Sequence, residues 1–293
     1  MSRKTAFCSV LLLLVSWASI VVPASAQHFQ QVNGPRLFLS AGRSEVFGID
    51  AGNAAWRYQA SSNSFKKIAG VLLDRIAVGG GTDSQPDDVW GISVSQQILR
   101  FNYSTNTFDE IPGTLSVITV GVGNEDQCHP YEVWGINASQ EVFRFDYCSG
   151  HFNQSPGSAL FSIATGGSDV WGINIDSDVY HYSFSQHKFI QVPGVLDQIA
   201  VGVNDVWGRN SSGEIYRYDP NNGSWNPKGF GAEVAAGGDG VWAIADNDSI
   251  FRFDSSADAF VQVPGALDSV TVGSGAGVFG LNISGEVFTF VRP

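Results

Sequence analysis

The sequence predicts an all-β protein, a seven-bladed β-propeller of four-stranded antiparallel blades. Two observations predict this class. A short segment, an acidic residue followed by Val-Trp-Gly, recurs along the chain, and short apolar runs bounded by Gly, Pro, Asn, Asp and Ser lie between its copies. Self-similarity at a fixed period is typical of repeat folds, and β-branched and aromatic runs between turn residues are typical of strands. A six-bladed ring is the alternative.

The recurring segment is clearest at residues 132–137, Glu-Val-Trp-Gly-Ile-Asn, with close copies beginning at Asp88, Asp169 and Asp205. Weaker copies at 45–50, 241–244 and 278–282 replace Trp by Phe or Gly by Ala. An aromatic residue opens each unit, and these residues are spaced by 36, 43, 44, 37, 36 and 35 positions: Phe29, Phe65, Phe108, Phe152, Phe189, Trp225 and Phe260. Four strand-like runs per unit and no helical periodicity favour a propeller.

The phase of the repeat predicts how the ring closes. The first strand-like run, residues 29–32, is an opening run, whereas the chain ends on the closing run 286–290. We therefore expect residues 29–32 to pair beside 287–290 and to complete the last blade. Such pairing removes a sheet edge that would otherwise be exposed.

Residues 1–26 have the features of a secretory signal peptide. Arg3 and Lys4 precede an apolar stretch at 7–22, and Ala-Ser-Ala at 24–26 fits a cleavage site. We expect a mature chain of residues 27–293 that forms one propeller domain. No second apolar run of that length follows, so we expect no membrane span. The protein is expected to be secreted, or periplasmic in a Gram-negative host.

Charge excludes several classes of partner. Without Arg3 and Lys4 the chain has 14 basic and 28 acidic residues. Phosphate backbones and anionic membrane surfaces repel such a protein, because binding to them depends on clustered Lys and Arg. Neutral ligands such as sugars remain compatible with this charge.

Cys128 and Cys148 remain after removal of the signal peptide, an even number in an oxidising compartment. In an antiparallel blade, the connection between the first and second strands and that between the third and fourth lie on one face. Cys128 belongs to the former connection and Cys148 to the latter, in the same unit. We therefore predict a disulfide between them, with two free thiols as the alternative.

The sequence offers no recognisable catalytic or metal-binding motif. It lacks G-x-S-x-G, H-E-x-x-H, a P-loop and C-x-x-C. The five histidines are scattered, and the acidic pairs at turns supply fewer oxygens than the six to eight that calcium takes. We expect no catalysis, no bound metal and no cofactor.

Two recurring sets of residues are the candidate binding residues. The first set has equivalent positions in the repeat: Trp90, Trp134, Trp171, Trp207 and Trp242. Their indoles could carry sugar rings, but packing between blades also demands a large residue there, and we favour packing. The second set lies beside aromatic residues: Arg100, Arg144, Arg217 and Arg252, with Arg57 as a further member. These arginines stack on neighbouring rings or donate hydrogen bonds to a ligand, and stacking is favoured.

Residues 189–218 carry the full pattern, with Val-Pro-Gly at 192–194, Val-Trp-Gly at 206–208 and Ile-Tyr-Arg-Tyr at 215–218. This pattern resembles the tectonin repeat, and the resemblance covers residues 29–290. The family includes horseshoe crab and fish egg lectins and slime-mould and fungal tectonins. The resemblance implies a multivalent lectin that binds cell-surface glycans, such as lipopolysaccharide or O-methylated sugars, between or beside blades. The alternative is a secreted protein–protein scaffold that uses the insertions at residues 80–87 and 123–131.

Overall fold

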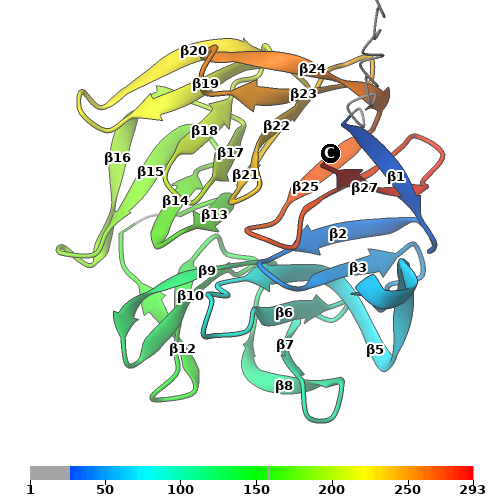
Figure 1. Ribbon diagram of the computed structural model, residues 1–293. Coiled ribbons are helices and arrows are strands. Elements are labelled where there is room, and N and C mark those ends of the chain that lie inside the picture. Colours follow the sequence, from blue (N-terminus) through cyan, green and yellow to red (C-terminus); the bar gives the residue numbers. More distant parts are fainter. Residues whose placement is uncertain (1–26, 158, 293) are drawn as a thin grey trace, which may run out of the picture.

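The computed structural model describes residues 27–157 and 159–292 (Figure 1). The predicted signal peptide, residues 1–26, lies outside the described residues. The regular structure of the described residues consists of strands and one short 3₁₀ helix, η1 (Ala60–Ser62). No described helix is long and apolar enough to cross a membrane.

Five of the sheets have four antiparallel strands each. In the first, the order is β1 (His28–Val32), β27 (Val287–Val291), β26 (Val278–Leu281) and β25 (Ser269–Val272). The second contains β9 (Val117–Asp126), β10 (His129–Ile136), β11 (Val142–Asp146) and β12 (His151–Ser155). The third contains β13 (Ser162–Gly166), β14 (Asp169–Ile173), β15 (Asp178–Ser183) and β16 (Lys188–Val195). The fourth contains β17 (Gln198–Val201), β18 (Val206–Arg209), β19 (Glu214–Asp219) and β20 (Ser224–Phe230). The fifth contains β21 (Glu233–Gly237), β22 (Gly240–Ile244), β23 (Ser249–Asp254) and β24 (Ala259–Ala266).

We call each four-stranded antiparallel unit of the ring a ladder. The sixth sheet has seven strands, because one long strand belongs to two ladders. Its strands are β2 (Leu37–Ala41), β3 (Val46–Asp50), β4 (Ala54–Gln59), β5 (Ser64–Gly79), β6 (Asp88–Ser93), β7 (Gln97–Asn102) and β8 (Thr107–Thr114). β5 pairs with β4 between Ser64 and Leu72 and with β6 between Leu73 and Gly79. The structure therefore has six hydrogen-bonded sheets, where the repeat predicts seven separate ones.

The sheets surround a common centre as a β-propeller (Figure 1). The innermost strands contact one another in a closed order, β2, β5, β9, β13, β17, β21, β25 and again β2. β1 pairs with β27 in register, Phe29 opposite Phe290 and Val32 opposite Val287. The predicted closure by the two ends of the chain is confirmed.

The apolar core lies between adjacent sheets. One cluster joins Trp134 and Val142 of the β9–β12 sheet to Ile163 and Tyr182 of the next sheet. Both faces of each sheet are therefore buried, which explains why apolar and polar residues do not alternate cleanly along the strands. The glycine that follows four of the five repeat tryptophans leaves room for a neighbouring side chain: a Cβ on Gly135 would lie 2.3 Å from Leu115.

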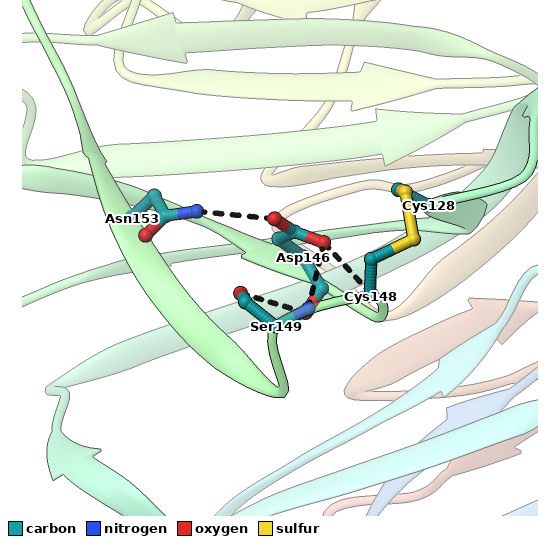
Figure 2. Close-up of a disulfide and its surroundings, with 5 residues drawn as sticks. All are labelled: Cys128, Asp146, Cys148, Ser149 and Asn153. Atoms are coloured by element: carbon teal, nitrogen blue, oxygen red, sulfur yellow. Dashed lines mark hydrogen bonds between the residues drawn. A yellow bond between two sulfur atoms is a disulfide. The ribbon is translucent and has the colours of Figure 1, made fainter.

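The two faces of the ring differ in the connections that they carry. On one face lie the connections from first to second strand and from third to fourth strand of each ladder, including Cys128 and Cys148. We call this the disulfide face. The predicted disulfide is present there, with Cα atoms 5.0 Å apart (Figure 2). The opposite face carries the connections from second to third strand and the links between ladders.

Candidate functional site

A polar unit recurs on the disulfide face of successive ladders. It consists of an acidic residue at the start of the second strand, a tryptophan two residues later, and a cation opposite that tryptophan on the third strand. Strand pairing sets Trp90 opposite Arg100, Trp134 opposite Arg144, Trp171 opposite His181 and Trp207 opposite Arg217. Phe47 and Arg57 hold the same places in the first ladder. The acidic residue belongs to the sequence repeat, but its pairing with the cation was not predicted.

All five tryptophans are buried, with 0–1% of each side chain exposed. Each indole packs edge-on against an aromatic ring from the next ladder. The contacts, with the distances between ring centroids, are Trp90–Phe145 at 4.7 Å, Trp134–Tyr182 at 4.5 Å, Trp171–Tyr218 at 4.8 Å, Trp207–Phe253 at 4.6 Å and Trp242–Phe290 at 4.7 Å. Their faces are covered, so this arrangement does not support the idea that they carry sugar rings, and it assigns them to packing between ladders.

The arginines stack on these indoles, as the favoured interpretation predicted. The distance from guanidinium carbon to ring centroid is 5.5 Å for Arg100 and Arg144, 5.8 Å for Arg217 and 5.7 Å for Arg252. In three units the arginine also bonds the acidic residue: Arg57 with Glu45, Arg100 with Asp88, and Arg144 with Glu132.

Exposure separates these units into two kinds. The acidic side chain is 14% exposed at Glu45, 3% at Asp88 and 0% at Glu132. At Asp169 it is 41% exposed, and at Asp205 it is 23% exposed. Only these last two carboxylates therefore offer a ligand substantial access.

A cavity of about 790 Å³ lies at these two carboxylates, between the β13–β16 and β17–β20 sheets. Its lining combines acceptors, donors and an apolar wall: Asp169, His181, Asp205, Arg217, Pro220 and Lys228. Of the predicted site residues, the structure brings Trp171 and Arg217 to this cavity.

His181 holds the place in this cavity that arginine holds in the neighbouring units. Its Nε2 lies 2.6 Å from Asp169 Oδ1, and its ring stacks on Trp171 with centroids 4.5 Å apart. Burial acts to raise the pKa of Asp169, but hydrogen bonds from His181 and Trp171 outweigh it and keep that pKa below the usual value. The carboxylate is therefore ionised and available as an acceptor at neutral pH.

The next unit is more open. Arg217 lies 3.7 Å from Asp205, longer than a direct hydrogen bond. The carboxylate of Asp205 lies against Gly202 instead: a Cβ atom on Gly202 would be 2.4 Å from Oδ1 of Asp205. Trp207 Nε1, buried, has no hydrogen-bond partner in the described chain, although Trp134 and Trp171 bond their acidic residues. Among the arginines of this set that form an ion pair, Arg217 therefore lies farthest from its neighbouring carboxylate.

The two insertions are folded against the body of the ring. In the first insertion, Asp87 is 1% exposed, and its carboxylate accepts hydrogen bonds from the backbone N–H groups of Arg43, Ser44, Glu45 and Gly81. The second insertion is tied by the disulfide, beside which Asp146 accepts from the N–H of Cys148 (Figure 2). Cys128, Asp146 and Cys148 gather ligand atoms within 4.8 Å, but both sulfurs are consumed by the disulfide.

The sequence model of the tectonin domain matches residues 35–231 and 228–292. No curated protein matches the chain. The fold is similar to a solved structure of YCF48 bound to D1 peptide, with a TM-score of 0.66 and 11% identity over 91% of this chain and 97% of that one. YCF48 from Cyanidioschyzon merolae gives 0.65 and 12% over 89% and 98%, and human WBSCR16 gives 0.62 and 9% over 90% and 88%. At these identities the likeness shows the fold alone.

Proposed function

The chain belongs to the tectonin family, and on that basis we propose that it is a secreted carbohydrate-binding protein without catalytic activity. We further propose that it is a seven-bladed propeller, in which the two halves of β5 belong to adjacent blades. Its seven innermost strands and the pairing of β5 with both β4 and β6 support this count.

The cavity at Asp169 is the observation that carries the proposed function. Its volume lies within the range of about 300–1,000 Å³ that is typical of small-molecule sites. A sugar presents hydroxyl groups that donate and accept hydrogen bonds, together with apolar C–H faces. Asp169 supplies acceptor oxygens, Arg217 and Lys228 supply N–H donors, and Pro220 supplies an apolar wall. Charges of both signs line the cavity, which suits a neutral, hydroxylated ligand.

A glycan array probed with residues 27–293 tests the proposal, and lipopolysaccharide and O-methylated sugars belong on the array. We expect Asp169→Asn to weaken the best signal by about 10- to 100-fold, because a hydrogen bond to a charged group contributes about 1.5–3 kcal/mol. Asp109→Asn is the matched control, since Asp109 bonds Asn102 outside the cavity. An array that stays silent at high protein concentration contradicts carbohydrate binding, and a signal unchanged in Asp169→Asn places the site elsewhere.

Secretion is a separate part of the proposal. Export with cleavage after Ala26 leaves Gln27 as the first residue, which N-terminal sequencing of the protein recovered outside the cytoplasm would detect. Protein that keeps residues 1–26 after export would contradict cleavage at this site.

A protein-binding scaffold is the second candidate function, supported by the face opposite the disulfide face. Each of several ladders places a large apolar side chain with 54–74% exposure there: Phe38, Leu72, Val94, Phe161, Ile175, Val195, Phe230 and Ile283. Exposed apolar surface of this kind marks interaction sites when it is contiguous. The combined change Phe38→Ser and Phe161→Ser should abolish capture of a protein partner and leave glycan binding intact.

A further inference from the structure

The first residue after the third strand differs between ladders in a way that follows the exposure of the carboxylates. In three ladders it is aromatic, and its ring covers the arginine of the preceding ladder. Tyr103 lies 5.4 Å from Arg57, Tyr147 5.0 Å from Arg100, and Phe184 5.4 Å from Arg144, measured from ring centroid to guanidinium carbon. We call these three residues the aromatic caps.

The caps coincide with the closed units. The carboxylates beside the three capped arginines are the less exposed ones: Glu45 at 14%, Asp88 at 3% and Glu132 at 0%. Tyr147 adds a direct hydrogen bond from its hydroxyl group to Asp88. A sugar hydroxyl group could reach these carboxylates only by displacing both the ring and the ion pair.

The cap is missing where the cavity opens. The residues that follow β19 and β23, and so occupy the positions equivalent to the caps, are Pro220 and Ser255. Neither side chain has an aromatic ring to cover the cation. Pro220 instead lines the cavity beside Asp169 and Arg217.

The remaining two units lack the charge pair itself. Arg252 has no ion-pair partner among the described residues, and the nearby Asp239 is bonded to Arg292 and to the N–H of Gly277. In the last ladder Thr289 stands opposite Phe279, so this unit has no cation. Of seven equivalent units, three are capped, two lack a charge pair, and two share the cavity at Asp169 and Arg217.

We propose that the disulfide face carries one open ligand site, at Asp169 and Arg217, and that Tyr103, Tyr147 and Phe184 close three equivalent sites. This proposal rests on the proposed carbohydrate binding and refines it, because a sevenfold repeat then presents one sugar site and not several. The identity of the cap residue, and not the Val-Trp-Gly segment, determines which unit is open.

Two reciprocal variants of the mature protein test the proposal. Pro220→Tyr supplies a cap to the open unit, and Pro220→Ala is its matched control, which keeps the unit open. Tyr147→Ser removes a cap and uncovers Asp88, and Phe184→Ser does the same for Glu132 should Tyr147→Ser fail to fold.

The first measurement needs no ligand. Carboxyl groups are amidated with a carbodiimide and glycinamide in the folded protein and quantified by peptide mass spectrometry. We expect Asp169 to react in the wild type and in Pro220→Ala, and to fall to the level of Asp88 in Pro220→Tyr. Asp88 should become reactive in Tyr147→Ser, or Glu132 in Phe184→Ser. Equal reactivity of Asp88 and Asp169 in the wild type, or an unchanged Asp169 in Pro220→Tyr, would overturn the proposal.

The second measurement is titration calorimetry with the strongest glycan from the array. We expect one sugar per wild-type chain, one for Pro220→Ala and none for Pro220→Tyr. Two or more sugars per wild-type chain would overturn the single open site even if binding itself is confirmed. A silent array would refute carbohydrate binding, whereas the labelling result would still decide whether the caps control access.

Discussion

Arg144→Met should destabilise the fold strongly, because it removes the positive partner of a buried carboxylate. Glu132 is fully buried, and Arg144 donates two hydrogen bonds to its carboxylate, one of them from Nε at 2.9 Å. Trp134 Nε1 donates a third at 2.8 Å. Removing the positive partner of a buried carboxylate costs about 3–5 kcal/mol, because the charge stays in a medium that solvates it poorly.

Arg217→Met is the matched control. Arg217 occupies the equivalent place on β19 and stacks on Trp207 in the same manner, but it lies 3.7 Å from Asp205 and both side chains are partly exposed. An exposed pair contributes about 0–1 kcal/mol. The difference in unfolding free energy between the two variants therefore measures the effect of burying the ion pair, because both variants lose the same arginine side chain.

Urea unfolding of residues 27–293 with the disulfide intact, followed by tryptophan fluorescence and circular dichroism, measures both variants. The pH dependence provides a second check. Burial raises the pKa of Glu132 above its usual value, and loss of Arg144 raises it further. An acid whose pKa is raised by folding loses stability as pH rises through the interval between the two pKa values. The deficit of Arg144→Met should therefore be small near about pH 4 and largest near about pH 8. A deficit below about 1 kcal/mol at neutral pH, or one equal to that of Arg217→Met, would refute the reasoning.

Three further predictions concern stability. Burial raises the pKa of Glu233 from 4.5 to about 7. Glu233→Gln should therefore add up to about 3 kcal/mol of stability near about pH 8, seen as a higher melting temperature, and none near about pH 4. The same change in melting temperature at both pH values would contradict this. The disulfide closes a loop with a sequence separation of 20, so replacing Cys128 and Cys148 by Ser should cost about 3 kcal/mol in urea unfolding, and an unchanged midpoint would rule out the effect. Val32→Ala should cost about 2 kcal/mol, because Val32 is 2% exposed where β1 completes the ring, whereas the exposed Gln31→Ala should be neutral; similar midpoints for both would count against a stabilising closure.

The sequence predicted the fold well because its repeat reports on packing. A tryptophan at the same place in most units is needed where sheets pack face to face, and the phase of the first and last strand-like runs indicated that β1 would join β27. The disulfide followed from the same topology, since Cys128 and Cys148 lie on connections that share a face.

The continuity of β5 could not be predicted from composition. The link between the first two units, Ala69–Gly70–Val71–Leu72–Leu73, contains a glycine with a positive φ of 79°, which suggests a break. The backbone nevertheless stays extended enough to pair on both sides. Pairing with two different neighbours, β4 and β6, overrides the local turn signal.

The candidate site was only partly predictable, because its defining contacts join different units. The pairing of Asp88 with Arg100 spans twelve residues within one hairpin, and a recurring acid–arginine spacing was present in the sequence as a signal. The contact of Tyr147 with Arg100 depends on how one ladder packs against the next. A single sequence shows Pro220 in place of an aromatic residue, but not that this residue lines the same cavity as His181.

The pairing of β1 with β27 also has a consequence for the order of events during synthesis. His28 and Val291 lie at opposite ends of the described chain, so β1 is synthesised more than 250 residues before its partner β27. Until then the β25–β27 sheet lacks its outer strand, and β1 exposes unpaired backbone groups. Contacts between residues so distant in sequence form slowly, and exposed strand edges are prone to aggregation. We infer that nascent chains halted before residue 287 leave the ring open at this sheet and are prone to aggregate through its unpaired strand edges.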